Sequence, residues 1–246
     1  MKILGLDSSG LVAGVAVVED DILLAEYNVN YKKTHSQTLL PMLEEVRDML
    51  ELSLDTIDAI AVASGPGSFT GLRIGSATAK GLGLALDKPL VEVPTLEGLA
   101  YNLCGVHDFV CPLIDARRNQ VYTGIYEFVA GAEGQAELEV VEPQTAVDIS
   151  IIIGRINELG TQNPGRGVIF LGDGVPVYKE KLEEQVKIPF SFAPAVSNRQ
   201  RAGSIAALGG VYYRQRRMVS AAEHRPEYLR KSQAERELKE KALKES

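Results

Sequence analysis

Short acidic and glycine-rich turns are the parts of this 246-residue chain that could do chemistry with a phosphate group. Asp7 and Ser8 follow a first apolar run, where a carboxylate and a hydroxyl can hold a hydrated magnesium ion and a phosphate. Both residue types are equally ordinary turn formers, and neither interpretation outweighs the other. A second tight turn after an apolar run is Gly172-Asp173-Gly174. These five residues form the candidate nucleotide site.

The most distinctive stretch runs from Ala61 to Leu86 and passes from an apolar strand through a glycine turn into a helix. Residues 64–68 form the turn, and Ser68 or Thr70 is the predicted N-cap of the helix. Backbone N–H groups at a helix N-terminus favour anions. A glycine turn is also a common entry into any α/β helix, and this simpler interpretation is favoured.

The helix predicted over Phe69–Leu86 contains four glycines and few long or charged side chains. Each interior glycine costs about 1 kcal/mol relative to alanine, which close packing on more than one side would offset. A second helix, predicted from Thr34 to Leu52 with a Thr34–Gln37 capping box, carries an apolar stripe wider than one core face. Both helices are therefore either core helices or part of an interface.

The composition excludes several classes of protein. The net charge is −7, from 26 Lys and Arg against 33 Asp and Glu, so the whole chain has no broad nucleic-acid footprint. Cys104 and Cys111 have no further Cys or His at a metal-ligand spacing, which favours a reduced, cytoplasmic protein. The chain begins with a predicted strand and no signal peptide, and no apolar run is long enough to span a bilayer.

The order of predicted elements repeats in the two halves of the chain. Residues 1–105 are predicted as a three-stranded antiparallel meander followed by alternating helices and strands, and residues 106–231 begin the same way. Asp7 and Asp115 occupy equivalent hairpin turns. Such duplication suggests an α/β fold of two subdomains that face each other across a cleft, as in the actin-like ATPases.

The second half is predicted to contain helices over Ala146–Leu159 and Ala202–Arg217. Tyr228 and Leu229 form a last apolar anchor after the second of these helices. Residues 232–246 are a charged tail of helical composition, and such a terminal segment is expected to fray.

Motifs spread over nearly the whole chain resemble the TsaB (YeaZ) proteins of bacteria. The glycine turn and the helix after it carry the most specific of these motifs, whereas the GDG turn alone would be weak. The matching segments are MKILGLDSS, THSQTLLPML, ASGPGSFTGLRIGSATAKGLGLA, VPTLEGLA, CPLIDARRNQVY, LGDG and PEYLRKSQAE.

The resemblance implies an actin-like fold (ASKHA, ribonuclease H-like) in both subdomains, each with a mixed sheet and flanking helices. It also implies a non-catalytic scaffold or activator subunit. Such a subunit dimerises with its paralogue TsaD, the threonylcarbamoyl transferase, for threonylcarbamoyladenosine modification of tRNA next to the anticodon. Further expected partners are a second copy of the chain when it is alone and the ATPase TsaE. Contact with tRNA is expected only through the complex, and no membrane is involved.

In this family the two N-terminal helices pack against the equivalent helices of TsaD. The resemblance therefore assigns the helices predicted at 34–52 and 69–86 to a partner interface, where glycines four apart permit close helix contact. The predicted interface residues are Leu39, Leu40, Leu43, Val46, Gly71, Leu72, Gly75, Ala79 and Leu82.

Catalytic paralogues carry a His-x-Glu-Gly-His motif, whose two imidazoles can bind one metal ion. This chain has Thr95 and Leu99 at those positions, so neither a metal site of that type nor catalytic residues are expected. Peptidase activity is disfavoured for the same reason and because the sequence lacks an HExxH or GxSxG motif.

The nucleotide pocket is expected to be degenerate. Arg117 and Arg118 stand where a second phosphate turn needs small residues, so no cofactor is expected beyond weak binding of ATP or ADP. The alternative is an actin-like ATPase or small-molecule kinase, in which Asp7 would support magnesium-dependent hydrolysis.

Overall fold

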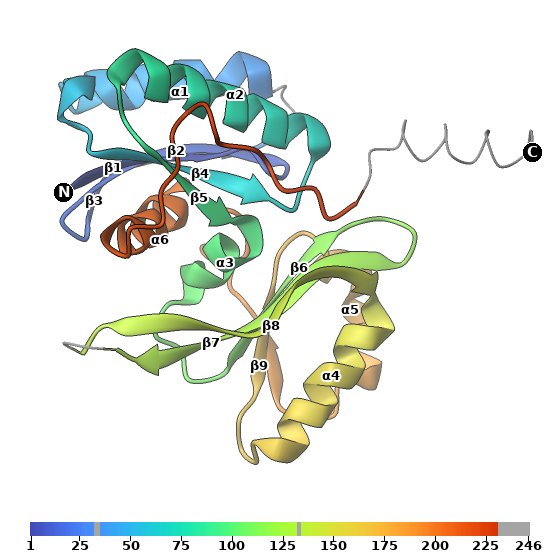
Figure 1. Ribbon diagram of the computed structural model, residues 1–246. Coiled ribbons are helices and arrows are strands. Elements are labelled where there is room, and N and C mark those ends of the chain that lie inside the picture. The colour runs from blue at the N-terminus through green and yellow to red at the C-terminus, as the bar shows by residue number, and fades with distance from the viewer. Residues whose placement is uncertain (32–34, 132–133, 231–246) are drawn as a thin grey trace, which may run out of the picture.

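Figure 1 shows the computed structural model of the chain, which describes residues 1–31, 35–131 and 134–230. The predicted capping residue Thr34 and the predicted tail at 232–246 lie outside the described residues. The chain forms two five-stranded mixed sheets with helices packed against them, which confirms the predicted two-subdomain α/β fold. No helix in the described parts of the chain is long and apolar enough to cross a membrane.

The first subdomain consists of β1 (Lys2–Asp7), β2 (Val12–Glu19), β3 (Ile22–Asn30), α1 (His35–Met49), the 3₁₀ helix η1 (Leu54–Thr56), β4 (Ala59–Gly65), α2 (Phe69–Leu86) and β5 (Leu90–Pro94). Its sheet has the order β3-β2-β1-β4-β5. Strands β1 to β3 form the predicted antiparallel meander, whereas β4 and β5 join β1 in parallel after helical crossovers. Helices α1 and α2 cover one face of this sheet.

The second subdomain consists of β6 (Phe109–Asp115), β7 (Gln120–Ala130), β8 (Ala136–Asp148), α4 (Ile149–Gln162), β9 (Val168–Leu171), α5 (Val175–Gln185) and β10 (Phe190–Phe192). Its sheet order, β10-β9-β6-β7-β8, repeats the topology of the first sheet, with β6 in the place of β1. Residues 146–148, predicted as the start of a helix, instead continue β8, because they pair with residues 120–122 of β7.

The last helix of each half packs against the sheet of the other half. Helix α6 (Ala202–Arg214) follows the second sheet in the chain but covers the second face of the first sheet, where Ile205 and Leu208 join its core. Helix α3 (Thr95–Ala100), continued by the 3₁₀ helix η2 (Tyr101–Leu103), places Leu96 and Leu99 in a core shared with β6 and β7. The two subdomains are therefore interlocked.

Glycine allows α6 to approach the first sheet closely. A Cβ at Gly5 of β1 would lie 2.6 Å from the Ala202 carbonyl oxygen, and one at Gly209 of α6 would lie 2.4 Å from the Ala61 Cβ. Neither position has room for a side chain. After α6, residues 218–230 run back along the first subdomain to the space between the two subdomains, as the red segment in Figure 1 shows.

Candidate functional site

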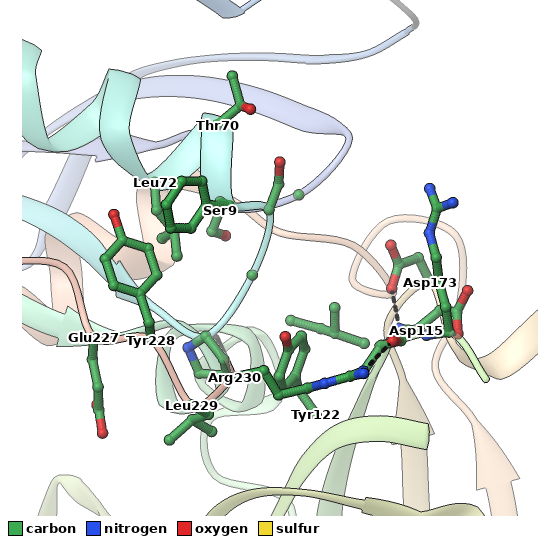
Figure 2. Close-up of a pocket in the computed structure, with 18 of the residues that line it drawn as sticks. Ser9, Thr70, Leu72, Asp115, Tyr122, Asp173, Glu227, Tyr228, Leu229 and Arg230 are labelled. Carbon is green, nitrogen blue, oxygen red and sulfur yellow. Dashed lines mark hydrogen bonds between the residues drawn. The ribbon is translucent and has the colours of Figure 1, made fainter. Parts of the chain in front are cut away.

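A cavity of about 660 Å³ lies where the first hairpin turns of both subdomains meet the C-terminal residues of the described chain (Figure 2). It corresponds to the cleft that the duplicated sequence predicts. The lining comes from residues 9–11, 66–70, 72, 114–117, 122, 173 and 227–230. Of the five residues predicted for a nucleotide site, only Asp173 is part of this lining.

Asp7 and Ser8 lie at the predicted turn after β1, but both side chains point into the protein and are only 2% exposed. The Asp7 carboxylate accepts hydrogen bonds from the Ser9 N–H at 2.8 Å and from the Ser9 hydroxyl at 2.7 Å. The Ser8 hydroxyl donates to the Gly71 carbonyl oxygen at 2.8 Å. Asp7 therefore shapes the β1–β2 turn, and Ser8 holds that turn against α2, so both residues have structural roles.

The glycine turn before α2 lies backbone to backbone against the β1–β2 turn. The Ser68 N–H donates to the Ser9 carbonyl oxygen at 2.6 Å. A Cβ at Gly67 would lie 2.2 Å from that same oxygen, and one at Gly71 would lie 2.0 Å from the Ser8 carbonyl oxygen. Ser68 is the N-cap of α2, as predicted, and its hydroxyl accepts from the Gly71 N–H at 3.3 Å. The most specific motif of the sequence is thus required by internal packing.

The GDG turn packs in the same manner against β6. A Cβ at Gly172, whose φ is +104°, would lie 2.1 Å from the Leu113 carbonyl oxygen, and the Gly174 N–H donates to that oxygen at 2.9 Å. Asp173 reaches across to accept from the Asp115 N–H at 3.1 Å. Burial raises the pKa of Asp173, although the Asp115 N–H opposes this shift.

The β6–β7 turn lines the other side of the cavity, and hydrogen bonds within its own backbone hold it together. Arg117, Arg118 and Asn119 all have left-handed backbone conformations, with φ of +62°, +58° and +59°. Each such residue with a side chain costs roughly 1–2 kcal/mol. The Asp115 carboxylate accepts from the Arg117 N–H at 2.8 Å, which stabilises the turn. The turn therefore exposes arginine side chains, while the Asp115 carboxylate is hydrogen-bonded to the backbone of the same turn.

The C-terminal residues complete the cavity, where the sequence predicted an apolar anchor and a segment that resembles the family but no part of a site. The Tyr228 ring packs on the Phe69 ring with their centroids 4.7 Å apart, although Tyr228 stays 39% exposed. Glu227 and Arg230 also line the cavity, and Arg230 extends across it toward the turn that carries Asp115 (Figure 2). Local patterns do not place these residues at the cavity, because their side-chain contacts join segments 83 and 114 positions apart.

Most residues predicted for the partner interface lie inside the first subdomain. Leu39, Leu43 and Val46 of α1 pack with Ala79 of α2 and with the sheet beneath. Leu72 of α2 is also buried, but it lies beside Gly65 at the cavity. These side chains are buried within the single chain, so their assignment to a partner interface stays a prediction and the structure shows them as core residues. The stripe that they form is the ordinary core face of an amphipathic helix, and its spacing does not distinguish the two uses.

The other predicted interface residues differ in exposure. Gly71 and Gly75 are buried against the Ser8 turn, and Leu82 is partly buried at the edge of the core. Leu40 is 51% exposed on the outside of α1. Of the nine predicted side chains, this one alone has the exposure that an interface needs.

The positions of the histidines in catalytic paralogues have structural roles here. Thr95 is fully buried, and its hydroxyl accepts from the Gly65 N–H at 3.1 Å. Leu99 is buried in the core between the subdomains, and the Glu97 carboxylate accepts from the Tyr212 hydroxyl. Within the described ranges, no three His, Cys, Asp or Glu side chains lie close enough to hold a metal ion.

Comparisons with known proteins agree with the fold. Residues 23–238 match the TsaD family, described as tRNA N6-adenosine threonylcarbamoyltransferase. The chain is 32% identical to the tRNA threonylcarbamoyladenosine biosynthesis protein TsaB of Bacillus subtilis, over 96% of each chain. It is 30% identical to TsaB of Haemophilus influenzae, over 94% of each chain. The solved structure of YeaZ from Pseudomonas aeruginosa, 26% identical, superposes with a TM-score of 0.73 over 93% of this chain and 99% of that one.

Proposed function

Because this chain belongs to the TsaB (YeaZ) family of tRNA threonylcarbamoyladenosine biosynthesis proteins, we propose that it is a non-catalytic partner subunit of a TsaD-type transferase. Its task is to bind and activate that transferase in the cytoplasm for the modification of tRNA next to the anticodon. Alone, it pairs with a second copy of itself through the same surface. The ATPase TsaE joins the complex, and tRNA binds only to the complex.

The observation that carries this proposal is the outer surface of α1 and α2, which we call the α1/α2 face. Large apolar side chains are exposed on it, with Leu40 at 51%, Met49 at 78% and Leu84 at 69%. On the exposed side of α2, Ala77, Gly81 and Ala85 recur every four positions and continue a row that begins with Arg73. The exposed side of α1 carries Glu44, Glu45 and Asp48 between Leu40 and Met49. The row of small residues on α2 allows another helix to approach closely, and the exposed Leu40, Met49 and Leu84 offer apolar contacts around it.

Gly81 is the central residue of this face. A Cβ at this position would meet no other atom within 4 Å, so nothing in the described chain requires glycine there. An interior helical glycine still costs about 1 kcal/mol relative to alanine. A partner helix packed against Gly81 would offset that cost, and a long side chain at this position would prevent such packing.

The cavity supports no catalytic role and no cofactor in this proposal. The Asp7 carboxylate is engaged with Ser9 inside the β1–β2 turn and does not line the cavity. Arg117 and Arg230 narrow the space in which a nucleotide would have to lie. Binding of ATP or ADP by the isolated chain is therefore weak in this proposal, and the kinase or ATPase alternative is not favoured.

The test compares Gly81→Arg with Gly154→Arg. Gly154 is a matched control, since it is exposed within α4 of the second subdomain and a Cβ there would also meet nothing within 4 Å. Light scattering after size exclusion measures the mass of each variant alone and mixed with the TsaD paralogue. We expect Gly81→Arg to remain folded but to weaken both complexes about 100-fold, equivalent to ~3 kcal/mol.

The control variant shows whether an arginine on an exposed helix elsewhere in the chain affects complex formation. Gly154→Arg is expected to form a homodimer and a one-to-one heterodimer like the unaltered chain. If Gly81→Arg binds the paralogue with unchanged affinity, the α1/α2 face is not the interface. If the unaltered chain forms no complex with the TsaD paralogue, the proposed function itself is wrong.

A further inference from the structure

The C-terminal segment, defined as residues 218–230, follows the edge of the first sheet without being one of its strands. Val219 and Leu90 of β5 exchange backbone hydrogen bonds, each 2.9 Å long. Farther along, the Glu227 N–H donates to the Ser64 carbonyl oxygen of β4 at 2.7 Å. The segment is thereby guided along the first subdomain to the cavity (Figure 1).

Side chains fasten the C-terminal segment to the first subdomain. His224 is 1% exposed, and its Nδ1 lies 2.7 Å from a Glu92 carboxylate oxygen of β5. The Lys80 ammonium of α2 donates to the His224 carbonyl oxygen at 3.0 Å. The Tyr228 ring contacts the Phe69 ring at the start of α2. These contacts leave the end of the segment directed at the second subdomain.

Two side-chain contacts then cross to the second subdomain. The Gln144 side-chain amide of β8 donates to the Glu227 carboxylate at 2.7 Å. The Arg230 guanidinium donates to the Ala116 carbonyl oxygen in the β6–β7 turn. Because Asp115 and Asp173 also line the cavity, Arg230 brings a positive charge to a part of it that carries carboxylates (Figure 2).

The first subdomain accommodates the C-terminal segment at a position where only glycine fits. Gly65, at the end of β4, has a φ of +115°, and a Cβ there would lie 2.3 Å from the Glu227 carbonyl oxygen. A side chain at residue 65 would therefore displace the segment from the cavity. The surface on which the C-terminal segment lies is thus part of the first sheet.

We propose that the C-terminal segment is an intramolecular clamp that closes the cavity and holds the two subdomains at a set separation. Within residues 1–31, 35–131 and 134–230, the chain passes from one sheet to the other after β5 and after β10, through the packed helices α3 and α6. The clamp adds a third link on the side of the cavity. Residues 227–230 occupy the space between the two hairpin turns and reduce the room for a ligand.

The experiment measures a distance across the cavity. Spin labels are placed on cysteines introduced by Thr70→Cys in the first subdomain and Arg118→Cys in the second, both exposed positions, in a Cys104→Ser background. Double electron–electron resonance then compares Arg230→Ala, Gln144→Ala and the double variant with the unaltered clamp. Circular dichroism and thermal unfolding establish that each variant is folded.

We expect the distance distribution to shift to longer values and to broaden in each single variant, and more so in the double variant. Arg225→Ala is the matched control, because it removes the same charge from an exposed side chain of the same segment that does not line the cavity. It should leave the distribution unchanged. An unchanged distribution in the folded double variant would overturn the clamp, as would an equal shift in Arg225→Ala.

Discussion

At the scale of single residues, the glycines of α2 divide into those that the chain itself requires and those that it does not. Gly71→Ala places a Cβ 2.0 Å from the Ser8 carbonyl oxygen, a backbone atom that cannot rotate away. We expect this substitution to lower the free energy of unfolding by about 3 kcal/mol, as overpacking against backbone does. Urea unfolding followed by circular dichroism measures the change.

Gly81→Ala is the control in the same helix. Its Cβ meets nothing within 4 Å, so the substitution should raise the free energy of unfolding by up to about 1 kcal/mol through helix propensity. Equal effects of the two substitutions would mean that α2 does not pack on the Ser8 turn as described.

The sequence predicted where the turn residues Asp7 and Ser68 lie, but not which contacts their turns make. The run Ile3–Leu6 correctly places Asp7 at a hairpin turn, and Ser68 is the N-cap of α2 as predicted. The Asp7 side chain bonds to Ser9 of its own turn, and that turn packs through Ser8 and Ser9 on residues 67–71, which are about 60 positions away. Such contacts leave no periodic signal, so the choice between ligand and packing could not be made from the sequence.

At the scale of elements, α6 depends on β3 for the capping of its N-terminus. Arg201, the N-cap residue, makes no side-chain capping bond. Instead the Asn28 side chain accepts from the Ala202 N–H at 3.2 Å, and the Glu26 carboxylate accepts from the Gly203 N–H at 2.8 Å and pairs with Arg201. A helix from the second half of the chain is thereby fixed on the first sheet.

Glu26→Ala should therefore lower the free energy of unfolding by about 3 kcal/mol at neutral pH, because it leaves helix N–H groups and Arg201 without their acceptor. Burial alone would raise the pKa of Glu26, but hydrogen bonds from Arg201, Asn28 and the Gly203 N–H outweigh it, so the pKa lies below the usual 4.5. The stabilisation is present above pH 4.5 and is lost as the pH falls through the folded-state pKa. Chemical unfolding of both chains from pH 7 to pH 3 measures it.

The difference in stability between Glu26→Ala and the unaltered chain should shrink toward low pH. Glu26→Gln is the control, since it retains an acceptor oxygen but no charge, and it should cost less than the alanine variant at pH 7. A difference that stays constant from pH 7 to pH 3 would show that the ionised carboxylate is not what fixes α6.

The sequence predicted strongly patterned elements and missed weakly patterned ones. The apolar runs predicted as the meander β1 to β3 and the small-residue run of α2 are confirmed within a few residues. Helix α5 buries only Tyr178 and Leu182, and β10 has three residues, so neither produces a readable period. The apolar stripe of α1 left core and interface open, because a helix stripe does not reveal which apolar surface it meets, and the structure places Leu39, Leu43 and Val46 in the core.

At the scale of the whole molecule, the two halves exchange their last helices. Without α6, the first sheet would expose the face formed by Ile3, Val18, Val91 and Val93. Each such side chain contributes roughly 1.5–3 kcal/mol when buried. Without α3, the core between Leu99 and the second sheet would be lost in the same way.

We therefore expect the chain to unfold as one cooperative unit in spite of its two sheets. Differential scanning calorimetry should show a single transition whose van't Hoff and calorimetric enthalpies agree. A fragment of residues 1–105, which ends at the domain boundary predicted from the sequence, should show no cooperative transition. It lacks α6, the helix that covers one of the two faces of its sheet. Coexpression of residues 1–105 with residues 106–246 supplies α6 from a separate chain and should restore a folded complex. Two calorimetric transitions, or a folded 1–105 fragment, would mean that packing within each sheet outweighs the exchanged helices.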